Sequence, residues 1–171
     1  MSTLPESRRS LTLRTLLVGL ALCWLAAPGN AEWCLLLVTC AFVGYLVDSH
    51  EQLPPRLASH FGFDLEANGW MNRRTYLIVF AALGVSIAVG LEVVGILARG
   101  ARAEFMARHV AWFACVFLAF LAGVHALIVR ANRNEPARLP KLFWGLLAGF
   151  QLAIAAWVGA ILAHDHWGWF K

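Results

Sequence analysis

The sequence predicts an all-α fold, a polytopic bundle of transmembrane helices, and three observations predict it. Of the 171 residues, 60% are hydrophobic and only 14% are charged, and the mean hydropathy is +0.66. The apolar residues gather in segments of about 20, which is the length that crosses a bilayer core. Charged residues flank these segments and are almost absent inside them, as is typical of transmembrane helices.

The low charge content argues against a soluble domain, in which about a quarter of the residues are usually charged. The formal charge of +4 comes from 14 Lys and Arg against 10 Asp and Glu, and most of these residues lie between apolar segments. This pattern suits loops beside anionic lipid headgroups. A nucleic-acid-binding protein would need a contiguous basic face instead. We therefore expect the lipid bilayer as a partner and no nucleic acid.

Three apolar segments in the second half are each long enough to span: residues 76–97, 110–129 and 142–163. Helices are expected there because lipid offers no partner to unpaired backbone groups. Charges stand at the segment ends: Arg73, Arg74, Arg108, Arg130 and Lys141.

The first fifty residues contain two further apolar segments, at about 11–27 and 33–47, separated by a turn signal at Pro28. One interpretation is a hairpin of two spanning helices. The alternative is a cleaved signal peptide, with Arg8 and Arg9 as its basic region and a small-residue cleavage site at residues 29–31. Residues 1–171 are thus expected to form one integral membrane domain with five spans, or four if the signal is cleaved.

The distribution of positive charge predicts the orientation. Two spans separate the loop at 48–75 from the loop at 130–141, so both loops lie on the same side. Arginine and lysine favour the cytoplasmic side, which places the loop at 48–75 in the cytoplasm. Its side holds Arg56, Arg73, Arg74, Arg130, Arg133, Arg138 and Lys141, against Arg99, Arg102, Arg108 and Lys171 on the other.

The loop at 48–75 is the only long polar stretch, and it carries a recognisable motif. The pattern is Leu-Pro-x-Arg-aliphatic-x-x-His-Phe, followed by a Glu and then Gly-Trp before the next span. Two prolines argue against a helix through its start, and Asn68-Gly69 predicts a turn. The loop is expected to be structured and to place its aromatic residues at the headgroup level. The motif residues are Leu53, Pro54, Arg56, Leu57, His60, Phe61, Glu66, Gly69 and Trp70.

This motif resembles a bacterial membrane-protein family, domain of unknown function 1648, which includes the SdpI-like toxin-immunity proteins. The resemblance covers about 30 residues and the helix that follows. The chain has Gly62, Leu65 and Asn68 where the family usually has Asn, Gly and often Asp. The resemblance implies a small multi-span protein of the bacterial inner membrane, without established enzymatic activity, for which some relatives provide immunity to a peptide toxin or signal its presence.

Within the loop, the candidate binding residues are those of the motif: Pro54, Arg56, His60, Phe61, Glu66, Gly69 and Trp70. His60 with Asp64 or Glu66 contains ligand types that bind zinc. Their spacing matches no known metal site, so we expect no metal and a structural role for His60.

Three polar residues lie inside the expected spans, namely Glu92, His125 and Gln151. Ionisable groups inside a membrane are costly and are functional candidates by default. At about 1.5 Å of rise per residue, His125 and Gln151 are expected to lie at depths where they can meet. Glu92 is expected to face His109 or Arg102. These residues could link helices by hydrogen bonds or carry protons.

No Ser-His-Asp set, phosphate loop, metalloprotease motif or haem-attachment motif is present. We therefore expect no catalytic activity and no cofactor. The sequence favours a protein that binds a peptide or another membrane protein. The alternatives are a small transporter or channel component and an accessory subunit of a membrane complex.

Overall fold

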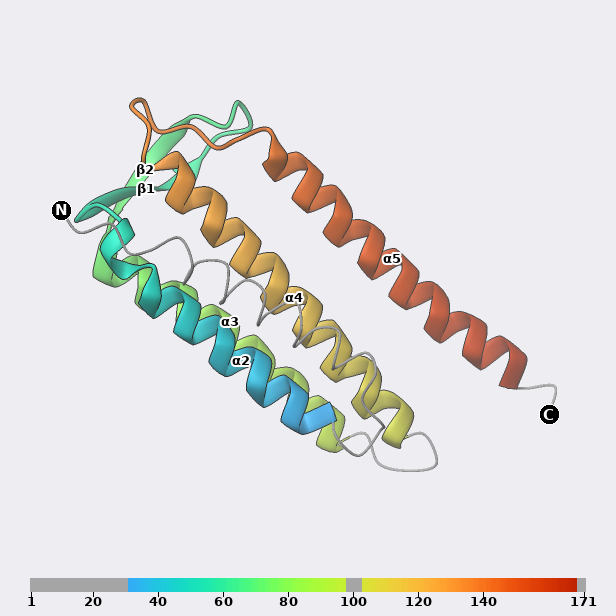
Figure 1. The fold of residues 1–171 in the computed structure, drawn as a ribbon. Helices are drawn as coiled ribbons and strands as arrows, with labels where there is room; N and C mark the ends of the chain where they lie inside the picture. The colour runs from blue at the N-terminus through green and yellow to red at the C-terminus, as the bar shows by residue number, and fades with distance from the viewer. Residues whose placement is uncertain (1–30, 98–102, 169–171) are drawn as a thin grey trace.

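The computed structural model describes residues 31–97 and 103–168, and the first expected span at 11–27 lies outside these ranges. The described part of the chain is mostly helical (Figure 1). Its elements in chain order are α2 (Ala31–Asp48), the 3₁₀ turn η2 (His50–Gln52), β1 (Arg56–Phe61), β2 (Ala67–Asn72), α3 (Arg73–Leu97), α4 (Ala103–Ala131) and α5 (Leu142–Gly168).

Three of these helices are long and apolar enough to cross a membrane. The spanning stretches are Arg73–Leu97 of α3, His109–Ala131 of α4 and Leu142–Ala163 of α5, with 25, 23 and 22 residues. They contain the three spans that the second half of the sequence predicts. The 18 residues of α2 include the expected segment at 33–47. These helices support an integral membrane protein.

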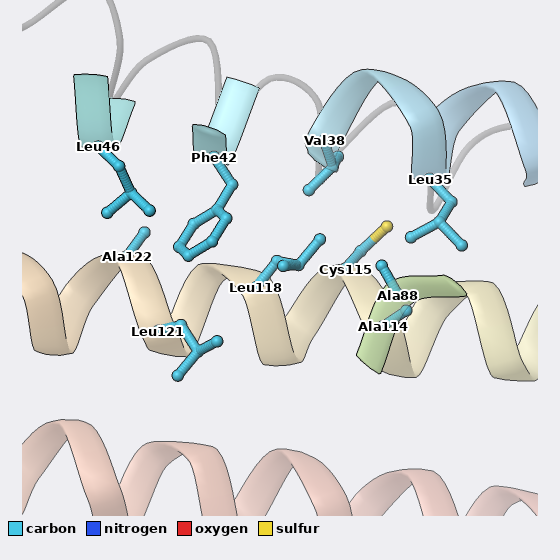
Figure 2. Close-up of a cluster of buried hydrophobic side chains, with 10 residues drawn as sticks. All are labelled: Leu35, Val38, Phe42, Leu46, Ala88, Ala114, Cys115, Leu118, Leu121 and Ala122. Carbon is cyan, nitrogen blue, oxygen red and sulfur yellow. The ribbon is translucent and has the colours of Figure 1, made fainter. Parts of the chain in front are cut away.

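Helices α2, α3 and α4 pack together around one hydrophobic core (Figures 1 and 2). Helix α2 contributes apolar side chains spaced three and four residues apart. This spacing places them on one face of the helix. Figure 2 shows these side chains facing α4, with the ring of Phe42 fully buried. The core residues are Leu35, Val38, Phe42 and Leu46 of α2, Ala88 of α3, and Ala114, Cys115, Leu118, Leu121 and Ala122 of α4.

A glycine allows α2 and α3 to approach closely. The ring of Phe42 on α2 occupies the space that a β-carbon on Gly84 of α3 would need. Small residues at such points are typical of helix contacts in membranes. The position of Phe42 in the core therefore depends on the missing side chain at Gly84.

Helix α5 lies along α4 and apart from α2 and α3 (Figure 1). Aromatic rings form the contact: Phe150 stacks on Phe120 with ring centroids 4.3 Å apart, and Trp157 lies 5.0 Å from Phe113. No residue from Leu142 to Ala163 is buried within the described structure. Most of the α5 surface is therefore available to lipid.

The motif loop forms an antiparallel hairpin of β1 and β2, which the all-α expectation did not include. The predicted turn at Asn68-Gly69 is wrong, because both residues belong to β2. Pairing of the strands extends to Phe61 and Ala67, so the chain must reverse between them. The amide of Leu65 donates a hydrogen bond to the Gly62 carbonyl at 2.9 Å, and Leu65 has a left-handed backbone with φ of 65°.

A second hydrophobic cluster joins this hairpin to the end of the bundle where α3 begins and α4 ends. Leu57 of β1 is fully buried in it. Its members come from the hairpin region, both helices and the connection between α4 and α5. They are Leu53, Leu57, Leu65, Tyr76, Leu127, Ile128, Val129, Ala131 and Leu139.

Candidate binding site at the hairpin end of the bundle

A cavity of about 590 Å³ lies between the hairpin and the connection from α4 to α5. Cavities that bind small ligands usually measure about 300–1,000 Å³. The hairpin wall consists of Pro54, Arg56, Glu66, Ala67 and Trp70. The opposite wall consists of Asn132, Asn134, Glu135, Pro136, Ala137 and Arg138.

Backbone hydrogen bonds hold the second wall against the hairpin. The amide of Ala67 donates to the Ala137 carbonyl at 3.3 Å, and the amide of Leu139 donates to the Leu65 carbonyl at 2.9 Å. Glu66 and Arg138 face each other as an antiparallel bridge. Their side chains also form an ion pair at 3.8 Å, with more than half of each exposed. Such an exposed pair contributes about 0–1 kcal/mol, so the backbone bonds carry the attachment.

Asn132, just beyond the end of α4, fixes the other edge of the hairpin. Its Oδ1 accepts a hydrogen bond from the amide of Ala58 at 2.7 Å, and its Nδ2 donates to the Ala58 carbonyl at 2.9 Å. The amide side chain thus presents to β1 the donor and the acceptor that a neighbouring strand would present. The connection between α4 and α5 is therefore hydrogen-bonded to both edges of the hairpin, and the cavity lies between the two.

The cavity walls combine both signs of charge with an exposed aromatic ring. The Arg56 and Glu135 side chains are exposed and have no hydrogen bond or ion pair within the described residues. Trp70 is 54% exposed. Tryptophan is enriched at membrane interfaces, and this one lies three residues before α3 begins. The geometry suits a ligand with charged and apolar groups.

The remaining motif residues build the hairpin instead of lining the cavity. His60 is paired with Gly69 across the two strands, and a β-carbon on Gly69 would lie 2.8 Å from the β-carbon of His60. Phe61 packs, partly buried, against the second hydrophobic cluster. The sequence motif therefore contains both wall residues and residues that shape their support.

The structure does not bring His60, Asp64 and Glu66 together as metal ligands. His60 is exposed on β1, Asp64 accepts a hydrogen bond from the amide of Glu66, and Glu66 pairs with Arg138. Within residues 31–97 and 103–168, no three His, Cys, Asp or Glu side chains come together in a group that could hold a metal ion.

His125 is fully buried between α2, α3 and α4. Its Nε2 lies 2.6 Å from Oγ of Ser49, and its Nδ1 lies 2.9 Å from the hydroxyl of Tyr76. Ser49 Oγ donates its proton to the Leu46 carbonyl, so it accepts from Nε2–H, while Nδ1 accepts from Tyr76. This neutral tautomer satisfies every donor and acceptor. The imidazole cannot take a proton from Ser49 in this state, because Nε2 already carries one.

His125 and Gln151, which the sequence suggested could meet, have different surroundings: the hydrogen-bond partners of His125 are Ser49 and Tyr76. Gln151 is exposed on α5, which turns Phe150 toward α4 instead. Glu92 lies half-buried on α3. Ser49 was missed by the sequence analysis because it lies in a polar loop and gives no sign of its partner. No family model, curated protein or solved structure matches the chain.

Proposed function

We propose that the protein is a non-catalytic membrane protein of the SdpI-like group that binds a peptide partner in the cavity, in toxin immunity or signalling. The observation that carries this proposal is the distribution of the motif. Four motif residues, Pro54, Arg56, Glu66 and Trp70, line one cavity. Others shape the hairpin behind it. A motif that builds a binding wall and its support is what a recognition function needs.

The backbone at Leu65 adds support for the family resemblance. The family usually has glycine at this position, and Leu65 has a left-handed φ of 65°. Glycine adopts this conformation without steric cost. The chain thus keeps the backbone shape that a glycine would favour.

We place the protein in a bacterial inner membrane, with the hairpin end in the cytoplasm. The basic residues at this end include Arg56 and Arg138 of the cavity, and positive charge favours the cytoplasmic side. A peptide that reaches the cavity would then do so at the inner headgroup level.

Survival of cells challenged with envelope-active peptide toxins tests the proposal. Deletion of the gene and the Trp70→Ala variant are expected to sensitise cells, because the indole forms part of the cavity wall. Trp144→Ala is the matched control, since Trp144 is also exposed, at 41%, but lies on α5 outside the cavity. If no toxin distinguishes the deletion or Trp70→Ala from wild type, the immunity function is wrong.

A further inference from the structure

The outer edge of β2 presents unpaired backbone groups at Trp70. Ala58 lies opposite Trp70 in the register of the hairpin. The N–H and C=O of Ala58 both bond to Asn132, outside the sheet, so they point away from β2. In an antiparallel pair the opposite residue shares this geometry. The N–H and C=O of Trp70 therefore point outward, away from β1.

The same outer edge already accepts a short length of chain a few residues away. Residues 137–139 run antiparallel to residues 65–67 and exchange backbone hydrogen bonds with them. Before Ala137 in the chain this pairing stops, because no backbone hydrogen bond joins residues 133–136 to β2. Beside Trp70, no backbone hydrogen bond from the described part of the chain fills the edge.

The cavity lies at this interruption. Ala67 and Trp70 of β2 line it from one side, and Pro136 and Ala137 line it from the other. The register of the hairpin shifts between Ala67 and Trp70, so a strand added beside Trp70 would pair there in its own register and not in that of residues 137–139. Such a strand would lie beside the cavity, because Trp70 itself lines it.

We propose that the partner in this cavity is an extended peptide that pairs with β2 at Trp70 as an added strand. The inference rests on the proposed function and specifies how that site binds. Backbone hydrogen bonds give such complexes affinity, and alternate side chains give them specificity. An apolar side chain of the peptide would contact Trp70 and the prolines, and an acidic one would meet Arg56.

Charge also favours a peptide over a phosphate headgroup. The cavity contains Arg56 and Arg138 together with Glu66 and Glu135, so its formal charges cancel. A phosphate would gain from the arginines but face both carboxylates. A peptide carries donors and acceptors along its whole length, and these can satisfy the open edge.

The test uses the full chain in phosphatidylcholine nanodiscs. Octapeptides that bind this protein are first selected from a random displayed library. Each backbone amide of a selected peptide is then N-methylated in turn. In a paired strand every second N–H points to the neighbour. We expect N-methylation at alternate positions to weaken binding about tenfold, the value of one hydrogen bond, and the intervening positions to have little effect.

Variants and lipid composition complete the test. Trp70→Ala is expected to weaken binding, whereas Gln151→Ala, on the exposed face of α5, should not change it. If the effects of N-methylation do not alternate along the peptide, strand pairing is wrong, although the peptide still binds. If phosphatidylglycerol in the nanodisc abolishes binding of the peptide, the cavity binds a lipid headgroup and the proposal is wrong.

Failure to enrich any octapeptide would also overturn strand addition. The proposed function would be wrong as well only if the Trp70→Ala variant and the gene deletion both left survival in the presence of toxin unchanged. The nanodisc and survival assays therefore separate an incorrect binding mode from an incorrect function.

Discussion

At the scale of single residues, Gly69 lies opposite His60 where the two strands come too close for a second side chain. Gly69→Ala would place a β-carbon 2.8 Å from the β-carbon of His60, which cannot swing aside. We expect it to lower the free energy of unfolding by about 1–3 kcal/mol, as overpacking does. Thermal unfolding in detergent measures the loss.

Gly149→Ala is the control for this substitution, because nothing lies within 4 Å of the new β-carbon on α5. Adding His60→Gly to Gly69→Ala removes the opposing β-carbon and should recover part of the stability. Equal stability of Gly69→Ala and Gly149→Ala would contradict the packing at His60.

His125 is predicted to stabilise the contact among three helices. His125→Leu leaves the buried Tyr76 hydroxyl without its acceptor, so we expect a loss of about 1–3 kcal/mol. The double variant His125→Leu with Tyr76→Phe removes both partners and should recover part of that loss. Unfolding of the single and double variants measures the coupling. Additive losses would show that the 2.9 Å hydrogen bond contributes nothing.

The partners of His125 mark a limit of sequence analysis at the residue scale. Its position inside an apolar span identified it as a polar residue that needs a partner. Ser49 and Tyr76 come from elements 76 and 49 residues away, and only the packing of three helices brings them together. Gln151 was expected at a suitable depth, but it is exposed on α5, and the direction in which it faces does not follow from depth.

At the scale of elements, the contact of α2 with α3 depends on Gly84. Gly84→Ala would place its β-carbon against the ring of Phe42 in the core, with an expected loss of about 1–3 kcal/mol. Gly90→Ala, on the same helix, meets nothing within 4 Å. It should cause no loss, because alanine favours a helix over glycine. Unfolding of the two variants under the same conditions compares them, and equal losses would argue against this packing.

The hairpin shows why element type was harder to predict than element position. Its place between two spans followed from its polarity. Its strands did not, because Asn68-Gly69 is a common turn pair but here lies within β2. The actual reversal uses Leu65 at positive φ, an uncommon choice for a bulky residue. The position of the reversal is therefore set by the pairing of Phe61 with Ala67 and not by the local turn preference of Asn68-Gly69.

At the scale of the whole molecule, the hairpin and the last residue of α5 lie at opposite ends of the bundle (Figure 1). With the hairpin in the cytoplasm, alkaline phosphatase fused after Lys171 should be active and green fluorescent protein fused there should be dark. The same reporters inserted after Asn134 should give the reverse result. An inactive phosphatase after Lys171 would reverse the proposed orientation.

The overall layout was predictable only in part. Apolar length fixes which segments can span, because lipid requires internally hydrogen-bonded backbone. The order of packing does not follow from length. Residues such as Phe42 and Phe150 look alike in sequence, yet Phe42 enters the core of α2, α3 and α4 whereas Phe150 attaches α5 to α4. The cavity was unpredictable for the same reason, since its two walls come from separate loops.

The bond of Asn132 to Ala58 has a consequence for self-association. Exposed strand edges are templates on which chains aggregate, but Asn132 occupies the free edge of β1 near the middle of that strand. Two copies that met through β2 would join two hairpins of two strands each. The outermost strands of that sheet would both be β1, each capped by an amide side chain. Growth into a fibre would stop there, so one side chain protects an otherwise receptive surface from uncontrolled polymerisation.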